Sequence, residues 1–124
     1  MVVDTSVILA VFFKEKYSGW AVEQMNLHAR ELRMSTINLT ETLIHLQDKQ
    51  PQLFASLEEK LLYNGIRFVA PDVEQSRIAA AARIKFPLNL GDCFAYALAY
   101  QEGCPILTLE KDFRVLNHEV IHPF

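Results

Sequence analysis

The chain has 124 residues, of which 51% are hydrophobic and 22% are charged, and its formal net charge at pH 7 is −3. This length and apolar content are enough to bury the core of one domain, which we expect to span residues 1–124. The charge balance and the lack of low-complexity stretches argue against a disordered chain. The slight acidic excess is not typical of a polyanion-binding protein, so an interaction with nucleic acid would need positive charge from another source.

The N-terminus begins with a strand-like Met1-Val2-Val3 and lacks the basic region, apolar stretch and cleavage site of a secretory signal. No apolar run approaches the roughly 20 residues that cross a bilayer. We therefore expect a cytoplasmic protein, in which Cys93 and Cys104 stay reduced. These cysteines lack the C-x-x-C spacing of zinc and redox sites, so neither indicates a functional thiol.

Short β-branched runs alternate along the chain with longer helical patterns, which indicates an α/β fold with a parallel sheet covered by helices. In chain order we predict a strand at 1–4, helices at 6–13 and 18–32, a strand at 33–35, helices at 39–49 and 52–63, a strand at 67–69, helices at 74–86 and 92–101, and strands at 105–109 and 119–121. Turn signals such as Asn64-Gly65 separate these elements.

The first acidic candidate, Asp4, follows the first predicted strand and precedes Thr5-Ser6. In open parallel sheets, ligands bind outside the carboxyl ends of the strands, so a carboxylate at this position lies where chemistry commonly occurs. Taken alone, Asp4 is more typical of a helix N-cap, whose side chain accepts hydrogen bonds from backbone N–H groups.

Two further acids belong to predicted helices. Glu41 lies at the edge of an apolar stripe beside Asn38 and His45, which suits a solvated rim position or, less commonly, a carboxylate turned into a cleft. Asp92 precedes the helix of 94–100, which is apolar on nearly all sides and should lie deep in the fold. An N-cap role explains Asp92 too, although an acid near the centre of the fold would need a cation or several donors.

Glu110 and Asp112 follow a fourth predicted strand, in a segment that alone would be a surface turn. Each acid therefore has a structural explanation, and the functional interpretation depends on the four positions together. Several carboxylates within a few ångströms cannot all stay ionised without a positive partner. Hard oxygen donors in that number favour Mg²⁺ or Mn²⁺.

The order and spacing of these acids resemble the PIN-domain family over the whole chain. The matching segments are Val3-Asp4-Thr5-Ser6, Thr40-Glu41, Leu90-Gly91-Asp92-Cys93-Phe94-Ala95 and Thr108-Leu109-Glu110-Lys111-Asp112-Phe113. The resemblance implies a three-layer α/β/α sandwich with a central five-stranded parallel sheet and an acidic pocket for one or two divalent ions. Family members of this size are commonly VapC-type toxins, which cleave RNA and are held inactive by an antitoxin protein.

By the same resemblance, Asp4, Glu41 and Asp92 match the three core acids, and we favour Asp112 over Glu110 as the fourth. The hydroxyl positions that orient metal or phosphate correspond to Thr5, Ser6 and Thr108. We therefore expect an endoribonuclease dependent on Mg²⁺ or Mn²⁺, with ions held by Asp4, Asp92 and Asp112 and with Glu41 as a ligand or as the base that positions water. Bulky Cys93-Phe94 departs from the small residues common after the third acid.

Bound metal would also change the charge balance, because adding four positive charges from two Mg²⁺ ions to −3 gives +1. The basic residues near the acids in sequence are Lys14, Lys16, Arg83, Lys85, Lys111 and Arg114. They are candidates to hold an RNA backbone, and solvated surface charge is an equally good interpretation of each.

Three other functions are weighed against the nuclease. The segment 118–122 matches the metalloprotease motif H-E-x-x-H, but we predict a strand there, which would hold the imidazoles about 13 Å apart. A phosphotransferase that uses Asp4 as nucleophile lacks the second Asp of its usual motif, since Ser6 stands there. A catalytically silent module could dock a protein through the helix of 20–27, which carries an aromatic residue and a Met and would suit a homodimer or an antitoxin, although core packing is the commoner use of such residues.

Overall fold

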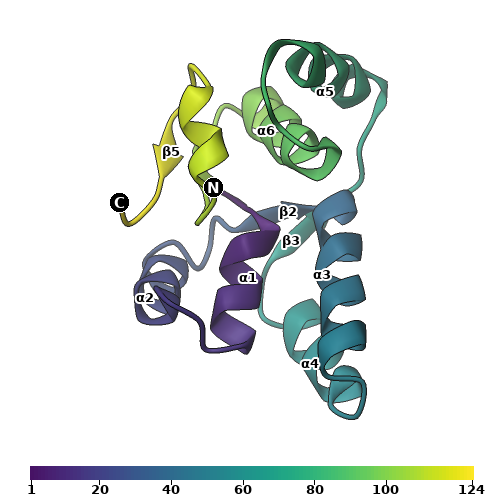
Figure 1. Ribbon diagram of the computed structural model, residues 1–124, viewed down its shortest axis with the longest axis vertical. Helices are drawn as coiled ribbons and strands as arrows, with labels where there is room; N and C mark the ends of the chain where they lie inside the picture. The colour runs from purple at the N-terminus through teal and green to yellow at the C-terminus, as the bar shows by residue number, and fades with distance from the viewer.

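Five parallel strands in the order β3-β2-β1-β4-β5 form the centre of the protein in a computed structural model that describes residues 1–124 (Figure 1). The elements in chain order are β1 (Val2–Val3), α1 (Thr5–Phe12), α2 (Ser18–Leu27), β2 (Arg33–Ser35), α3 (Thr36–Lys49), α4 (Phe54–Leu62), β3 (Arg67–Val69), α5 (Val73–Lys85), α6 (Leu90–Glu102), β4 (Ile106–Leu107), the 3₁₀ helix η1 (Lys111–Val115) and β5 (Val120–Ile121). The predicted strands and helices are all present, and the predicted α/β class with a five-stranded parallel sheet is confirmed. No helix combines the length and the apolar character needed to span a membrane.

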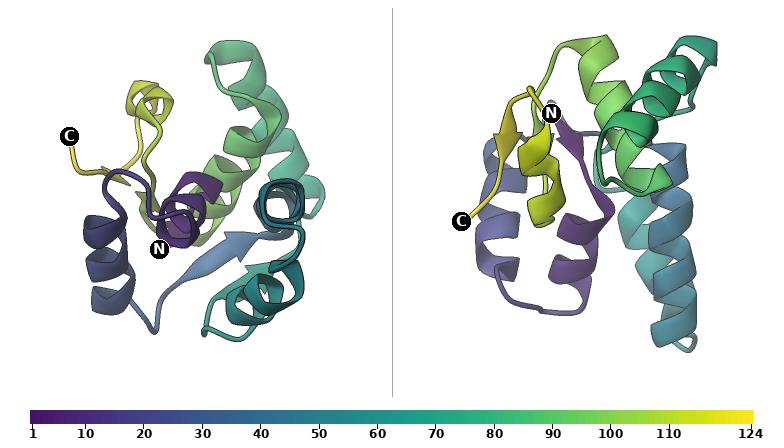
Figure 2. Two further views of the ribbon diagram at one scale, coloured as in Figure 1. Left: turned by 60° about the horizontal axis from the view of Figure 1, so that its bottom comes forward. Right: turned by 45° about the horizontal axis from the view of Figure 1, so that its top comes forward.

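Alternating side chains of the sheet divide the core into two parts. Val2 and Ile106 belong to a cluster with α5 and α6, whereas Val3 and Leu107 belong to a cluster with α1 to α4. Successive residues of a strand point to opposite faces, so helices cover the sheet on both sides and form the predicted three layers. Figure 2 shows α5 and α6 (green) side by side, apart from α1 (purple).

The end of α2 differs from the prediction, because the helix stops at Leu27 instead of continuing to Leu32. The N-terminal ammonium group of Met1 donates a hydrogen bond of 2.9 Å to the carbonyl oxygen of Glu31. Leu32 is buried in the core, immediately before β2. This contact between distant parts of the chain holds the segment in a turn, and no local sequence signal encodes it.

The carboxyl ends of β1 and β4 lie next to each other, since Val3 pairs with Leu107. The backbone N–H of Asp4 donates to the carbonyl oxygen of Leu107 over 3.0 Å. Asp4 and Thr108 therefore follow neighbouring strands at the same edge of the sheet. Because Ser35 ends β2 and also caps α3, the first turn of α3 starts from this edge as well.

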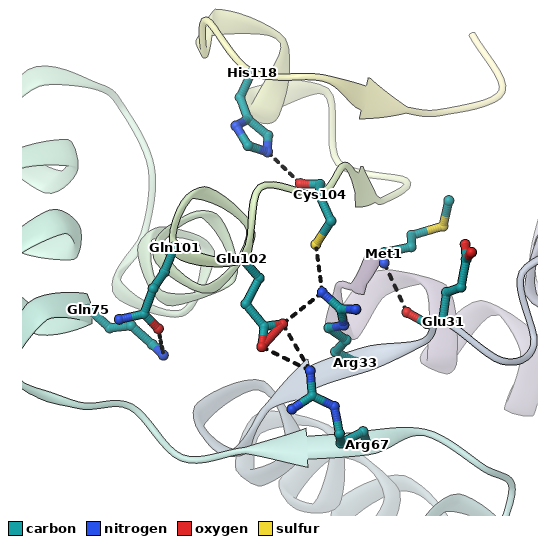
Figure 3. Close-up of polar contacts among 9 residues, drawn as sticks. All are labelled: Met1, Glu31, Arg33, Arg67, Gln75, Gln101, Glu102, Cys104 and His118. Atoms are coloured by element: carbon teal, nitrogen blue, oxygen red, sulfur yellow. Dashed lines mark hydrogen bonds and ion pairs between the residues drawn. The ribbon is translucent and has the colours of Figure 1, made fainter.

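The amino edge of the sheet carries a charge cluster of Glu102, Arg33 and Arg67 (Figure 3). Arg33 and Arg67 are paired in register on β2 and β3, and Glu102 at the end of α6 lies 2.8 Å from the first and 2.9 Å from the second. Arg33 also donates to the Sγ atom of Cys104. The cluster ties the last turn of α6 to two strands, and this fixes the helix whose first turn carries Asp92.

The segment of the H-E-x-x-H match lies at the sheet edge, as predicted, with Val120–Ile121 forming β5. A ring nitrogen of His118 lies 2.7 Å from the carbonyl oxygen of Cys104. The ring of His122 stacks on Phe124 with the ring centres 4.9 Å apart. The two imidazoles thus have separate partners.

Candidate active site

Asp4 occupies the N-cap position of α1, but its side chain makes no capping hydrogen bond. Its Oδ2 atom instead accepts hydrogen bonds from the hydroxyls of Ser6, at 2.8 Å, and Thr108, at 3.0 Å. The residue is only 2% exposed. Asp4 therefore lies at the predicted N-cap position, but its carboxylate is oriented by two of the three predicted hydroxyl residues.

Burial raises the pKa of the Asp4 carboxyl to about 6, and the negative charge of Glu110 adds to this effect. The hydrogen bonds from Ser6 and Thr108 act in the opposite direction, because they stabilise the ionised form. Desolvation exceeds their effect, so the folded protein holds this carboxylate in an environment that opposes its charge.

Asp92 is the third residue of α6, and the N-cap of that helix is Asn89. The side chain of Asn89 accepts the backbone N–H of Asp92 at 2.8 Å, so the cap interpretation of Asp92 is wrong. Burial is the main cause that raises the pKa of Asp92 to about 7, followed by the charge of Asp4 and those of Glu110 and Glu41. A hydrogen bond to the backbone at Asn89 lowers it. The sequence signal for this cap was the Asn that precedes Leu-Gly-Asp.

Glu41 comes from α3 and is held from two sides. Its Oε1 atom accepts hydrogen bonds from Nδ2 of Asn38 at 2.9 Å and from the hydroxyl of Thr5 at 3.2 Å. The carboxylate lies against Gly91 of α6, in the space that a β-carbon at that position would fill. Glu41 is therefore not a solvated rim residue, since the glycine of α6 admits it to the cavity.

Asn38 connects the two helices that contribute Glu41 and Asp92. It is fully buried, and its Nδ2 atom also donates to the carbonyl oxygen of Gly91 at 3.0 Å. Its Oδ1 atom has no hydrogen-bond partner. The sequence placed Asn38 near Glu41 through its spacing of three residues on a helix, but gave no reason to assign it this role.

A cavity of about 150 Å³ lies between these side chains. The residues that line it are Asp4, Thr5, Ser6, Leu9, Glu41, His45, Asn89, Asp92 and Glu110. We call it the acidic pocket. Its four carboxylates come from the ends of two strands and from two helices, which is the arrangement expected from the sequence.

The sequence profile of the PIN domain matches residues 1–119. The chain belongs to the PIN-domain family. The VapC ribonuclease Mb2780c of Mycobacterium bovis is 33% identical over 132 residues, which cover 99% of this chain and 98% of that protein. The ribonuclease VapC of Mycolicibacterium smegmatis is 29% identical over 98% of this chain and 100% of that protein.

Solved structures of VapC and VapBC proteins share the fold at low sequence identity. VapC20 of Mycobacterium tuberculosis, described as a toxin that cleaves the sarcin–ricin loop, superposes with a TM-score of 0.83 at 16% identity over 98% of both chains. VapBC2 of Rickettsia felis, bound to a DNA fragment from its promoter, gives a TM-score of 0.81 at 15% identity over 98% of this chain and 96% of that chain. These likenesses support the three-layer architecture.

In this PIN domain, the preference for Asp112 over Glu110 is not supported by the geometry. Glu110 lines the acidic pocket, and its charge raises the pKa of both Asp4 and Asp92. Asp112 is exposed on η1 and does not line the pocket. Phe113, the next residue, is fully buried, and its anchoring in the core leaves Asp112 on the outer side of the 3₁₀ turn.

The donor set of the PIN pocket suits a hard divalent cation. The charges of Asp4, Glu110 and Glu41 all raise the pKa of Asp92, and a bound cation would relieve this repulsion. No three His, Cys, Asp or Glu side chains converge on a point from which all could bind one ion. Mg²⁺ commonly binds through one or two carboxylates and keeps several waters, so this geometry is compatible with it.

In α2, the helix with the predicted docking surface, the partly buried Trp20 and Met25 pack against the core cluster that contains Val3 and Leu107. Val22 and Leu27 of the same helix are exposed. The commoner interpretation of Trp20 and Met25, core packing, therefore applies to this PIN domain.

Proposed function

We propose that the protein is an endoribonuclease dependent on Mg²⁺ or Mn²⁺ and the toxin of a VapBC-type toxin–antitoxin pair. One observation carries the catalytic part of this proposal. Asp4 and Asp92 are buried beside each other's charge, neither side chain makes a helix-capping hydrogen bond, and the pKa of each is raised, to about 6 and about 7. Perturbed carboxylates that converge in a cavity are characteristic of functional sites.

The residues of the acidic pocket have two roles: some would bind the cation, and others orient the carboxylates that bind it. Ser6 and Thr108 fix one oxygen of Asp4, while Asn38 and Thr5 fix Oε1 of Glu41 and leave Oε2 free to bind a cation or to accept a proton from water. A bound divalent cation would activate water and stabilise negative charge on the phosphate. In this scheme Asp4 and Asp92 bind the cation directly, Glu110 contacts it through a retained water, and Glu41 is a water-mediated ligand or the base that positions the attacking water.

The catalytically silent alternative loses its main support, because it requires the acids to be helix caps. A test of the enzyme is cleavage of single-stranded RNA by the purified protein, with EDTA and after Mn²⁺ or Mg²⁺ is restored. We expect cleavage only with the metal, and loss of cleavage in Asp4→Asn. Asp48→Asn, which changes an exposed acid on α3, is the matched control. Cleavage that persists in a folded Asp4→Asn protein would exclude the proposed chemistry.

The toxin part of the proposal is supported by relatives named VapC ribonuclease and by solved relatives that are VapBC complexes. We propose an antitoxin protein as the partner of this chain and a homodimer as its assembly. Expression of the protein alone should arrest growth, and co-expression with the product of a neighbouring small gene should restore growth and yield a complex on size exclusion with light scattering. Harmless expression of an active nuclease would contradict the toxin role and leave the enzymatic proposal standing.

A further inference from the structure

A second groove adjoins the acidic pocket and has a different character. Its volume is about 330 Å³, and it shares Ser6, Leu9 and Glu110 with the acidic pocket. The other residues that matter here are Lys16 and Tyr17, from the loop between α1 and α2, and Lys49, the last residue of α3. A polymer that crosses the acidic pocket on this side would enter the groove.

The aromatic ring in this groove is held in place from two directions. Tyr17 has a φ angle of 69° and Lys14 one of 52°, a left-handed backbone conformation that non-glycine residues rarely adopt. The backbone N–H of Glu15 donates to the carbonyl oxygen of Ala10, which fixes the loop to α1. The ring of Tyr17 contacts Phe124 edge to face, with centres 6.0 Å apart. The loop and the C-terminal residue together present Tyr17 at the groove.

Positive charge is concentrated around the same rings, although the chain as a whole carries −3. The Nζ atom of Lys16 lies 5.0 Å from the centre of the Tyr17 ring. Lys111 and Arg114 lie over Phe124, at 5.4 and 5.8 Å from its ring centre. Three of the basic residues that the sequence placed near the acids, Lys16, Lys111 and Arg114, therefore lie at or beside the groove. Lys49, which the sequence analysis did not single out, also lines it.

The basic side chains and the Tyr17 ring of the groove suit a nucleotide better than an apolar ligand. The volume lies at the lower end of the range of about 300–1,000 Å³ for small-molecule pockets. Single-stranded nucleic acids are bound by aromatic rings that stack on bases and by basic side chains that follow the phosphates. Glu15 is the opposing charge in the lining, apart from Glu110 of the acidic pocket.

We propose that this groove is the subsite for the nucleotide next to the scissile phosphate of single-stranded RNA, with Tyr17 stacking on the base and Lys16 and Lys49 binding the backbone. The inference rests on the proposed nuclease function, which it deepens by naming the strandedness of the substrate and the side from which it enters. It also answers the charge objection raised by the sequence, because the positive charge required for RNA lies beside the acids.

The test is binding of a short fluorescein-labelled single-stranded RNA, followed by fluorescence anisotropy in EDTA. We expect Tyr17→Ala and Tyr17→Leu to weaken binding about tenfold, equivalent to ~1.4 kcal/mol, and Tyr17→Phe to bind like the unchanged protein, because the stacking surface remains. Lys16→Gln and Lys49→Gln should each reduce the slope of log affinity against log salt by about 0.7. Matched controls on α4 and its cap are Lys60→Gln and Tyr63→Ala, whose side chains lie outside the groove.

Melting temperatures show whether each variant is folded, and only folded variants are compared. Equal binding by Tyr17→Ala and the unchanged protein, or an equal loss in Tyr17→Phe, would overturn the stacking role. No binding by the unchanged protein would overturn the subsite altogether. Because binding is measured in EDTA, these outcomes are distinct from a failure of the proposed nuclease, which would appear as absence of cleavage when metal is present.

Discussion

The two edges of the sheet treat their carboxylates in opposite ways. At the amino edge, the half-buried Glu102 lies within 3 Å of two guanidinium groups, which neutralise its charge. At the carboxyl edge, Asp4 and Asp92 have hydroxyl, backbone and amide neighbours but no cationic side chain, and the pKa of each is raised. Charge that is neutralised within the protein contributes to structure, whereas charge that is left without a counter-ion is available to a ligand.

The largest effect that tests this contrast is expected from Asp92→Asn. It should reduce RNA cleavage by about 100-fold or more, since a metal-binding carboxylate contributes several kcal/mol to charge stabilisation. The same change should raise the melting temperature of the metal-free protein, because it removes a repulsive charge from Asp4 and Glu110. Cleavage assays and calorimetry measure the two results. A variant that loses activity and stability together would indicate a structural role for Asp92.

A backbone substitution tests whether the position of Glu41 matters. Gly91→Ala would place a methyl group where the Glu41 carboxylate now lies, and we expect about a 100-fold loss of kcat, as misplacement of a catalytic group by about 1 Å can cause. Gly19→Ala, at a position in α2 with no neighbouring atoms within 4 Å of the added carbon, is the control. Equal activity of the two variants would show that Glu41 can move without consequence.

A change at the amino edge of the sheet, where Glu102 is neutralised by two arginines, should alter the stability of the protein and leave its activity unchanged. Glu102→Gln leaves Arg33 and Arg67 adjacent without a counter-charge, and the free energy of unfolding should fall by about 1–2 kcal/mol, between the values for exposed and buried pairs. RNA cleavage by the folded fraction should not change. Urea denaturation measures the effect, with Glu59→Gln on the exposed surface of α4 as reference. A loss of cleavage at full stability would mean that the two edges are coupled through α6.

The last test is the pH dependence of the stability of the metal-free protein. Asp4 and Asp92 have pKa values of about 6 and 7 in the folded state and about 3.8 when unfolded, so the folded state binds more protons between these limits. The free energy of unfolding should therefore fall as the pH rises from 4 to 7, which is opposite to the usual behaviour of paired carboxylates. Thermal melts in EDTA across this range measure the slope. Asp92→Asn should flatten it, and an unchanged slope in that variant would assign the effect to other groups.

Local patterns in the sequence were sufficient for most of the fold, and the bounds of β2 and β3 match the prediction. Asp4, Glu41 and Asp92 were selected by their combination and by the resemblance to the PIN domain, since each of them alone has a structural explanation, and all three line the acidic pocket. The features that local patterns did not predict involve distant contacts. The segment after α2 is held by a hydrogen bond from the ammonium group of Met1, and Asp112 is exposed next to the buried Phe113 while Glu110 lines the acidic pocket.

The side-chain roles around the pocket could not be predicted for the same reason. Whether Asp4 caps α1 or faces the cavity depends on a hydroxyl from Thr108, and whether Glu41 is exposed depends on the absence of a side chain at Gly91. Both partners lie in other segments of the chain, so periodicity and capping rules evaluate each acid without them.

The hydrogen bond between Thr108 and Asp4 joins residues that are 104 positions apart. While the protein is being synthesised, Asp4 leaves the ribosome long before Thr108 is added to the chain, and β1 has no β4 beside it. The acidic pocket is therefore incomplete in every shorter nascent chain. Under the proposed function, the protein would be unable to attack RNA near the ribosome that makes it until almost the whole polypeptide has folded.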